Sequence, residues 1–348
     1  MRYKLLGKSG LRVSELCLGT MTFGTEWGWG AEEADSRKMF DTFLNAGGNF
    51  IDTANRYTEG TSEKLVGKFI RDAGVRDKTV LATKYTLFME QGDPNSAGNH
   101  RKNMVQAVEH SLKRLGTDYI DLYWLHAWDF MTPVEEVMRG LDDLVRSGKV
   151  VYVGVSDTPA WVVSRSNMLA ELRGWSPFVA LQIEYSLIER TVERELIPMA
   201  RELDLAVTPW GAIGGGILTG KYSGQTDQPK RYDPKDQPSR LTKENIAIGD
   251  EVVKIAKEMG CAPSEVAINW VRQQPGLQIP IIGARNADQL AENLACLEHP
   301  LSQEHLDRLD QVSRIDLGFP MEFITKDFIR NLIFAGTFDK IDNHRAKY

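Results

Sequence analysis

The chain has 348 residues, of which 42% are hydrophobic and 26% are charged, a composition typical of a globular protein with a large core. Its formal net charge of −6 and the lack of a basic stripe argue against nucleic acid as a partner, because phosphate binding needs clustered Lys and Arg. No apolar run is long enough to cross a bilayer or to form a signal peptide, so we expect a cytoplasmic protein without membrane contact. Cys17, Cys261 and Cys296 lie far apart and lack metal-ligand spacing, so we expect no metal site.

The chain opens with a pattern typical of a β-hairpin, over residues 3–15 with its turn at 8–10. After it, short apolar runs alternate eight times with amphipathic stretches of helical period. The expected strands are residues 16–20, 49–53, 79–84, 120–126, 151–156, 180–186, 205–210 and 278–283. The expected helices are residues 34–46, 62–71, 101–115, 134–147, 159–172, 195–203, 263–274 and 286–296.

These strands are apolar on both faces, as parallel strands covered by helices must be. Eight such units close into a (β/α)8 TIM barrel, here about residues 16–298 of one domain spanning 1–348, with the hairpin placed to plug its bottom. A doubly wound open sheet is the alternative. That fold places a glycine fingerprint after its first strand, and residues 19–24, GTMTFG, do not match the fingerprint.

Two segments lie outside the repeat. Residues 221–258 form a long loop after the seventh strand, and such loops are usually functional; we expect an extra helix over 246–259 within it. A C-terminal tail, residues 299–348, carries five Phe and is a candidate to fold over the barrel. These are Phe319, Phe323, Phe328, Phe334 and Phe338.

Polar residues stand at the ends of the expected strands, where the active sites of such barrels lie. Asp52, Lys84 and His126 close the second, third and fourth strands. Alone, each has an ordinary explanation, as a turn former, a Lys reaching for water or a structural His. Together, an acid, a base and an imidazole on three consecutive strands converge on one small volume and favour chemistry. The next three strands add Ser156, Gln182 and Trp210.

Several blocks resemble the aldo-keto reductase family. Residues 50–57 read FIDTANRY and resemble its first signature, in which an Asp and a Tyr stand five apart. Further blocks follow in order: GTSEKLVG at 60–67, LGTDYIDLYWLH at 115–126, QIEYS at 182–186, LTGKY at 218–222 and IGAR at 282–285. The resemblance runs from about Leu5 to Val312. It implies an oxidoreductase that reduces an aldehyde or ketone to an alcohol with NAD(P)H.

The resemblance assigns four catalytic residues: Asp52, Tyr57, Lys84 and His126. Tyr57 is expected to give the proton while the cofactor gives the hydride. Lys84 is expected to lower the pKa of Tyr57 from its usual value of about 10, because a positive charge favours the phenolate. Asp52 would hold Lys84, and His126 would donate a hydrogen bond to the substrate oxygen.

A nicotinamide site is assigned in the same way. Its expected residues are Thr20, Met21, Asp52, Ser156, Asp157, Gln182, Trp210, Gly211, Ile213, Gly215, Lys221, Arg240, Gly283, Arg285, Gln289 and Asn293. Ser156 and Gln182 match the positions that bind the carboxamide, and Trp210 matches the aromatic residue that stacks on the nicotinamide. Arg285, just before the last barrel helix, is suited to a 2′-phosphate, which favours NADPH over NADH.

The chain departs from the family pattern at three of these places. Asp157 replaces the usual Asn after Ser156 and lacks its amide donors. Residues 211–212 read Gly-Ala in place of Ser-Pro, and residues 283–284 read Gly-Ala in place of Lys-Ser, which leaves Arg285 with more of the cofactor discrimination.

Aromatic residues in the expected loops form a candidate substrate wall for a small carbonyl compound. The candidate substrate residues are Tyr57, His126, Trp27, Trp29, Tyr85, Phe88 and Trp128. Such a wall suits apolar aldehydes and equally the faces of sugars.

Two other functions are considered. One is a cofactor-binding regulatory subunit related to channel β subunits, against which the intact catalytic set argues. The other is an aldolase with Lys84 as a Schiff base, which requires a desolvated Lys without a paired acid, and Asp52 argues against it. The sequence leaves the oligomeric state open.

Overall fold

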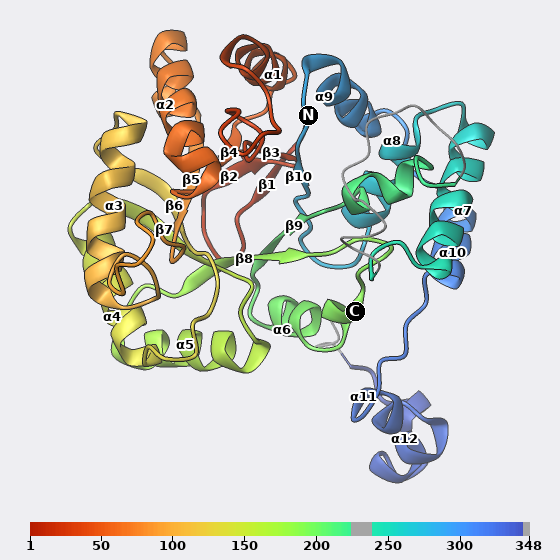
Figure 1. Ribbon diagram of the computed structural model, residues 1–348. Helices are drawn as coiled ribbons and strands as arrows, with labels where there is room; N and C mark the ends of the chain where they lie inside the picture. The colour runs from red at the N-terminus through yellow and green to blue at the C-terminus, as the bar shows by residue number, and fades with distance from the viewer. Residues whose placement is uncertain (224–238, 344–348) are drawn as a thin grey trace.

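The structure is a computed structural model that describes residues 1–223 and 239–343. Its main feature is a sheet of eight parallel strands that closes into a barrel (Figure 1), which confirms the expected (β/α)8 TIM barrel. The strands, in chain order, are β3 (Cys17–Gly19), β4 (Phe50–Asp52), β5 (Val80–Tyr85), β6 (Ile120–Leu125), β7 (Val150–Ser156), β8 (Phe178–Glu184), β9 (Ala206–Trp210) and β10 (Ile281–Ile282). β10 pairs with β3, and a bridge between Val207 and Gln278 joins β9 to the segment just before β10.

Helices surround the strands on the outside of the barrel, as Figure 1 shows. They are α1 (Glu33–Asn45), α2 (Thr61–Ala73), α3 (Arg101–Leu115), α4 (Val134–Arg146), α5 (Ala160–Arg173), α6 (Leu196–Glu202), α8 (Pro263–Arg272) and α9 (Ala287–Leu294). All eight expected helices are present within a few residues of their expected bounds. Glycines in the left-handed conformation follow several of them, for example Gly74, Gly116 and Gly174, because only glycine adopts that backbone without strain.

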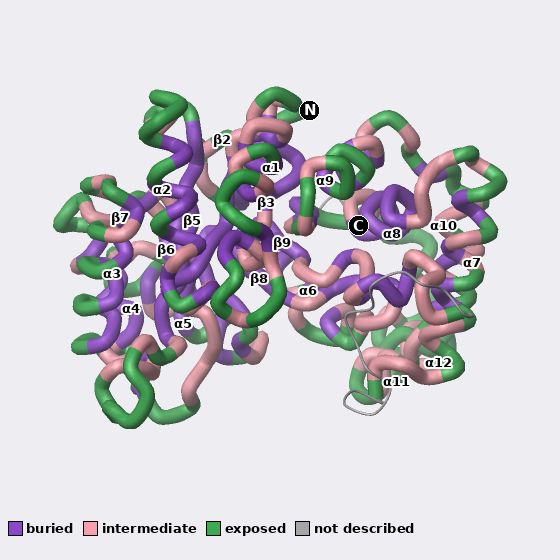
Figure 2. The backbone as a smooth tube through the Cα atoms, turned by 45° about the horizontal axis from the view of Figure 1, so that its top comes forward, coloured by how far each residue is buried: buried purple, intermediate pink, exposed green. Residues whose placement is uncertain are grey.

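Alternate residues of each strand point to opposite sides, which divides the core into two layers. Inward-pointing residues such as Phe50, Ala82 and Trp124 pack together inside the barrel. Outward-pointing residues such as Ile51 and Leu81 pack against the helices. Figure 2 shows the strands as the most buried part of the molecule. This alternation decides which side chains reach the mouth of the barrel.

The N-terminal hairpin, β1 (Tyr3–Leu5) and β2 (Arg12–Ser14), closes the bottom of the barrel, where the strands begin. Leu6 and Val13 are fully buried among the inward-pointing residues. Lys4 Nζ donates to the carbonyl of Gln278 at 2.6 Å, which ties the hairpin to the segment before β10. The active end of the barrel is therefore the opposite end.

The insertion after β9 contains the expected extra helix, α7 (Lys243–Met259), and residues 224–238 of the insertion lie outside the described part. After α10 (Gln303–Val312), the chain leaves the barrel through α11 (Met321–Ile324) and α12 (Asp327–Ile333), a tail that lies apart from the strands in Figure 1. None of the residues 314–343 is buried. The described tail does not fold over the barrel, contrary to that expectation. Within the described ranges, no helix is long and apolar enough to span a membrane.

Candidate active site

The inward positions at the carboxyl ends of the strands bring the expected residues together. Asp52 follows inward-pointing Phe50 by two residues, and Lys84 follows Ala82 in the same way. His126 is two residues beyond inward-pointing Trp124. Because the strands are parallel and adjacent, these three side chains meet at one mouth of the barrel.

Lys84 is the centre of the cluster. Its side chain is fully buried and its ammonium group forms an ion pair with Asp52. The same nitrogen donates to the carbonyl of Thr53 at 2.9 Å and to the hydroxyl of Tyr57 at 3.1 Å. Gln182 Nε2 donates to the other oxygen of Asp52 at 3.2 Å. The carboxylate therefore has two partners that keep it oriented toward Lys84.

Tyr57 lies in a single helical turn, η1 (Tyr57–Gly60), just after β4. Burial raises the pKa of Tyr57, and Lys84 offsets only part of that effect, so the net pKa lies above the usual value of 10.0. This corrects the expectation that Lys84 would bring the pKa below 10: the desolvation of a tyrosine side chain cannot be judged from residue spacing. The phenol keeps its proton at neutral pH and is an acid in the resting enzyme.

Lys84 keeps its proton and its positive charge at neutral pH. Burial opposes the charge, but the attraction of Asp52 and the bond to Tyr57 outweigh it, and the pKa of Lys84 lies above 10.5. A Schiff-base lysine needs the opposite shift, so that its amine is free. The structure thus argues against the aldolase alternative.

His126 is neutral at physiological pH. Burial, followed by the charge of Lys84, holds its pKa well below 6.5. Its Nδ1 is buried and has no hydrogen-bond partner among the described residues. The ring stands edge-on to Tyr57, with 5.9 Å between the two ring centroids. A neutral imidazole beside the phenol can donate from Nε2 to an oxygen that also meets the Tyr57 hydroxyl.

Aromatic rings extend outward from Tyr57. Trp27 stands edge-on to Tyr57 at a centroid distance of 6.4 Å, and Trp29 lies 5.6 Å from Trp27. Trp27 Nε1 donates to Glu59 at 3.0 Å, which fixes the indole plane. These rings make an apolar wall that begins at the ring of Tyr57.

The other expected substrate residues do not all lie at the mouth of the barrel. Phe88 is partly exposed, and the guanidinium of Arg56 lies over its ring at 4.4 Å. Trp128 is half-buried, and its backbone N–H donates to Asp157. Tyr85 was assigned wrongly to the pocket. It is one residue beyond Lys84, so it points outward, where it is fully buried and stacks on Tyr123 with 5.3 Å between centroids.

The expected carboxamide residues lie at the inner edge of the mouth. Ser156 ends β7 and is buried, and no described residue bonds its hydroxyl. Gln182 uses its amide nitrogen on Asp52, while no described residue donates to its amide oxygen. Trp210 ends β9 and is half-buried, with its Nε1 donating to Asp157 at 3.3 Å. Hydroxyl, amide oxygen and indole face fit one end of a nicotinamide.

The glycine segment after β9 brings backbone close to the mouth. Gly211, Gly214, Gly215 and Gly216 all have positive φ, and Ile213 is half-buried between them. Glycines let a phosphate approach the backbone closely, although the N–H groups of Gly214 and Gly216 already donate to Gly211 and Ile213 within the segment. The segment fits the pyrophosphate expected there.

Two basic residues were also expected to aid the cofactor. Arg240 instead forms a two-pronged ion pair with Glu184, in which Nη2 lies 2.8 Å from Oε2. Its charge is therefore already matched within the protein. Lys221 is half-buried just before the part of the loop outside the described ranges.

The adenosine end is expected around α9. Arg285 is half-buried, and no described acid pairs with its guanidinium; its backbone N–H donates to Gln289 at 3.0 Å. Asn293 Nδ2 donates to the carbonyl of Gly283 at 3.2 Å. An unmatched guanidinium beside the first turn of a helix suits a phosphate.

The residues that follow β3 contribute less directly to the expected cofactor site. Thr20 is fully buried and its hydroxyl donates to the Asp52 carbonyl at 2.9 Å, so it supports β4. Met21 is half-buried beside it. Over the described ranges, no group of three or more His, Cys, Asp and Glu is placed to hold a metal ion.

Sequence reasoning missed Glu59 and Glu184. Glu184 is two residues after Gln182 on β8, so the same alternation that identified Gln182 also indicates Glu184. Glu59 sits at φ 55 in the turn after Tyr57, and no pattern in the sequence points to its contact with Trp27.

Comparisons with known proteins identify the family of the chain. The model of the aldo/keto reductase family matches residues 15–314. A norsolorinic acid reductase of Aspergillus flavus is 39% identical over 328 residues, which cover 92% of this chain and 83% of that protein. An aryl-alcohol dehydrogenase [NADP(+)] of Phanerodontia chrysosporium is 36% identical over 354 residues, covering 95% of this chain and 91% of that protein. A putative aryl-alcohol dehydrogenase of Saccharomyces cerevisiae is 37% identical over 339 residues, covering 94% and 90%.

These findings confirm the expected oxidoreductase that reduces a carbonyl group with a nicotinamide cofactor. Neither the family model nor these relatives support a channel subunit. The eight-stranded barrel, the cluster at its mouth and a match over most of its length place the chain in the aldo/keto reductase family.

Proposed function

We propose that this chain reduces aromatic aldehydes and ketones with NADPH, and that Tyr57 supplies the proton. The observation that carries the proposal is the bond from the Lys84 ammonium to the Tyr57 oxygen at 3.1 Å. Because Lys84 donates to that oxygen, the phenol proton remains free to face the substrate. The bound reduced nicotinamide supplies the hydride.

The remaining residues have separate tasks in this proposal. Neutral His126 donates to the substrate oxygen and sets the direction of the carbonyl. As the proton leaves Tyr57, the fixed charge of Lys84 stabilises the phenolate that forms. Asp52 and Gln182 keep Lys84 in place, so little reorganisation is needed at the moment of transfer.

The aromatic wall supports a flat, apolar substrate. Trp27 and Trp29 continue outward from Tyr57, so a ring attached to the carbonyl would lie against other rings. The names of the relatives point the same way, because two are aryl-alcohol dehydrogenases and one is a norsolorinic acid reductase.

NADPH is proposed over NADH because of Arg285. Its guanidinium is not paired with a described acid and stands beside the first turn of α9, where a 2′-phosphate would add an anion. The relative from Phanerodontia chrysosporium carries NADP(+) in its name.

The test is NADPH oxidation with substituted benzaldehydes and, for comparison, short aliphatic aldehydes. We expect higher kcat/KM for the aromatic set. Tyr57→Phe should lower kcat roughly 10²- to 10⁴-fold, the usual contribution of a positioned acid. Its binding of NADPH, measured by quenching of tryptophan fluorescence, should stay within a few-fold. Equal turnover by the wild type and Tyr57→Phe would refute the role of Tyr57.

A separate variant tests the cofactor. Arg285→Ala should raise the KM for NADPH and leave that for NADH nearly unchanged, because only NADPH carries the 2′-phosphate. Arg173→Ala is a matched control, since Arg173 is exposed at the end of α5, away from α9. If Arg285→Ala keeps the preference of the wild type, Arg285 does not discriminate between the cofactors.

A further inference from the structure

Asp157 occupies a constrained position directly after β7. Its φ of 38° lies in the left-handed region, which Asp and Asn enter more readily than other residues with side chains. Its backbone N–H donates to Gln182 at 3.2 Å, and its carbonyl accepts from Trp128 at 3.4 Å. These bonds tie the backbone to β8 and to the loop after β6, so the direction of the side chain is set by three segments.

The side chain reaches across the mouth to Trp210. Oδ1 of Asp157 accepts a hydrogen bond from Trp210 Nε1 at 3.3 Å. Asp157 follows β7 and Trp210 ends β9; these strands are separated by β8, so the bond bridges one strand of the barrel. Trp210 is half-buried at the edge of the mouth. The bond from its Nε1 to Asp157 restricts the rotation of the indole plane.

We propose that ionised Asp157 is a positioning residue: it holds the Trp210 indole in the orientation that receives the nicotinamide ring, and it releases the indole when it takes up a proton. This inference rests on the proposed function, because it takes the nicotinamide to lie against Trp210. It gives a purpose to the acid that stands where the family pattern has Asn.

The charged and titratable groups that face Asp157 come from several elements. Partial desolvation by the surrounding protein raises the pKa of Asp157 to about 6; the bond from Trp210 and the charge of Lys84 lower it, and Glu184 raises it. The negative charge of this carboxylate also raises the pKa of Tyr57. Arg240 forms an ion pair with Glu184 and neutralises much of its charge. Asp157 remains solvent-accessible at the rim of the mouth, so protons reach it freely.

The protonation state matters because a bond to a carboxylate is roughly twice as strong as a neutral one. Above pH 7 Asp157 is ionised and the indole is held. Below pH 5 it is protonated and the bond is weak. Cofactor affinity should therefore fall by roughly 5-fold between these limits, the change expected from halving a hydrogen bond to a charged group.

The first experiment observes the free enzyme. With ¹⁵N-labelled tryptophan, the indole N–H signal that disappears in Trp210→Phe belongs to Trp210. In the wild type this signal should shift with a midpoint near pH 6, and in Asp157→Asn it should stay constant. A pH-independent signal in the wild type would overturn the proposal.

The second experiment measures the affinity for NAD⁺, which lacks the 2′-phosphate and is stable in acid, by calorimetry at pH 5 and 7.5. The affinity of the wild type for NAD⁺ should be roughly 5-fold lower at pH 5 than at pH 7.5. Asp157→Asn and Trp210→Phe should bind weakly and equally at both pH values, and the double variant should bind no worse than either single variant. Phe keeps a ring to stack but lacks the N–H, so it isolates the bond.

Two outcomes would contradict the proposal. If Trp210→Phe keeps the pH dependence, Asp157 acts on the cofactor directly and not through the indole. If Asp157→Asn keeps the pH dependence, a group other than Asp157 causes it. Neither outcome affects the test of Tyr57, which is made by turnover of NADPH and aldehyde at a fixed pH. Circular dichroism confirms the fold of each variant before binding is measured.

Discussion

At the scale of single residues, the ion pair of Lys84 and Asp52 links stability to chemistry. Both side chains are buried, so each charge depends on the other. A buried pair contributes little by itself, but breaking it leaves one charge without compensation. The charge of Lys84 therefore persists because the fold cannot easily lose it.

Lys84→Met should lower the free energy of unfolding by about 3–5 kcal/mol, because Asp52 is left buried and unpaired. The double variant Asp52→Asn, Lys84→Met should regain much of this loss, since neither charge then remains. Urea denaturation of the wild type, both single variants and the double variant measures the effect. A double variant that loses the sum of the two single losses would show that the pair has no special coupling.

His126 gives a prediction about pH. Its pKa in the fold lies well below 6.5, while the unfolded chain has the ordinary value, so the unfolded state binds more protons between the two. Stability from this residue is therefore present above about pH 6.5 and decreases as the pH falls, by at most about 1.4 kcal/mol per pH unit.

The comparison of wild type with His126→Gln isolates this effect. The free energy of unfolding of the wild type should approach, or fall below, that of the variant as the pH drops from 7.5 to 5. Asp157, whose raised pKa acts in the opposite sense, is present in both chains and cancels. A constant difference over this range would contradict the assignment of a buried, neutral His126.

At the scale of elements, the alternation of side chains along each strand explains what the sequence predicts well. Asp52, Lys84 and His126 end apolar runs and share the inward parity, so they could be placed without any structure. Tyr85 was misplaced because it was expected in a loop, whereas β5 continues through it. Successive side chains of a strand point to opposite faces, so Tyr85 points outward where Lys84 points inward.

Other features depend on contacts that sequence spacing does not contain. The pKa of Tyr57 depends on the desolvation of its side chain by the assembled mouth, and the bond from Trp210 to Asp157 joins residues 53 positions apart. The ion pair of Arg240 with Glu184 likewise joins residues that are 56 positions apart in the sequence.

The hairpin gives a prediction at this scale. Gly7 has a φ of 55°, and a Cβ there would lie 2.2 Å from the carbonyl oxygen of Val179. Gly7→Ala should therefore cost about 2–4 kcal/mol in the free energy of unfolding, from the left-handed backbone and the clash with backbone that cannot move far. Gly10→Ala is the control from the same hairpin, because nothing lies within 4 Å of the added Cβ. It should change stability by less than about 0.5 kcal/mol; equal losses in both variants would contradict a tightly fitted plug.

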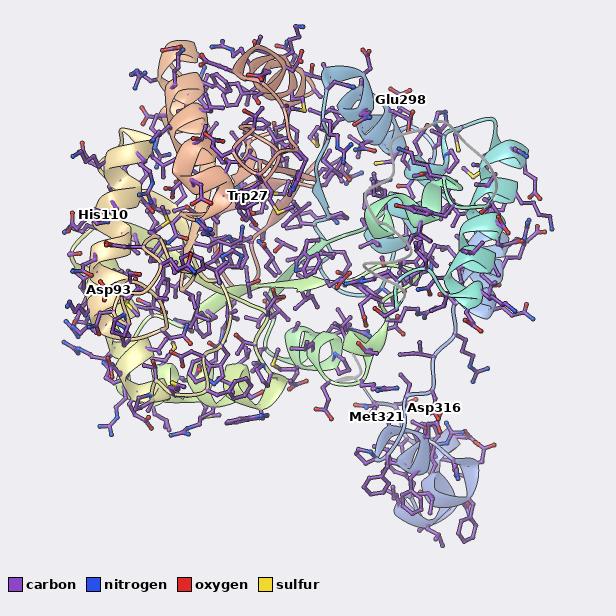
Figure 3. All side chains as sticks on the ribbon, viewed as in Figure 1. Trp27, Asp93, His110, Glu298, Asp316 and Met321 are labelled. Atoms are coloured by element: carbon purple, nitrogen blue, oxygen red, sulfur yellow. The ribbon has the colours of Figure 1, made fainter. Side chains whose placement is uncertain are left out.

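At the scale of the whole molecule, the described tail is separate from the catalytic barrel. Figure 3 labels Asp316 and Met321 on the tail, well apart from Trp27 on the barrel. Phe319 and Phe328 are 85% and 69% exposed, so they contribute little to the core. Near the start of the tail, Arg194 donates to the Asp316 carbonyl at 2.8 Å.

Ending the chain after Leu317 should therefore shift Tm by less than roughly 4 °C, the effect of about 1 kcal/mol, and should leave kcat/KM for benzaldehyde unchanged. Ending it before α10 is the contrasting variant. That helix buries Leu309, and Asp310 accepts from Trp270 Nε1 at 3.0 Å, so its loss should unfold the protein. A large loss of activity in the variant that ends after Leu317 would mean that the tail serves the active site.

The hairpin at the bottom of the barrel has a practical consequence. Met1 lies beside Gly47, just before β4 begins, and Tyr3 donates to the Gly47 carbonyl at 3.0 Å. The first residue therefore emerges at the end of the barrel opposite to the mouth. An enzyme immobilised through its N-terminus on a bead or an electrode would stand with its mouth facing the liquid, so aldehyde and cofactor would diffuse to it without obstruction from the support.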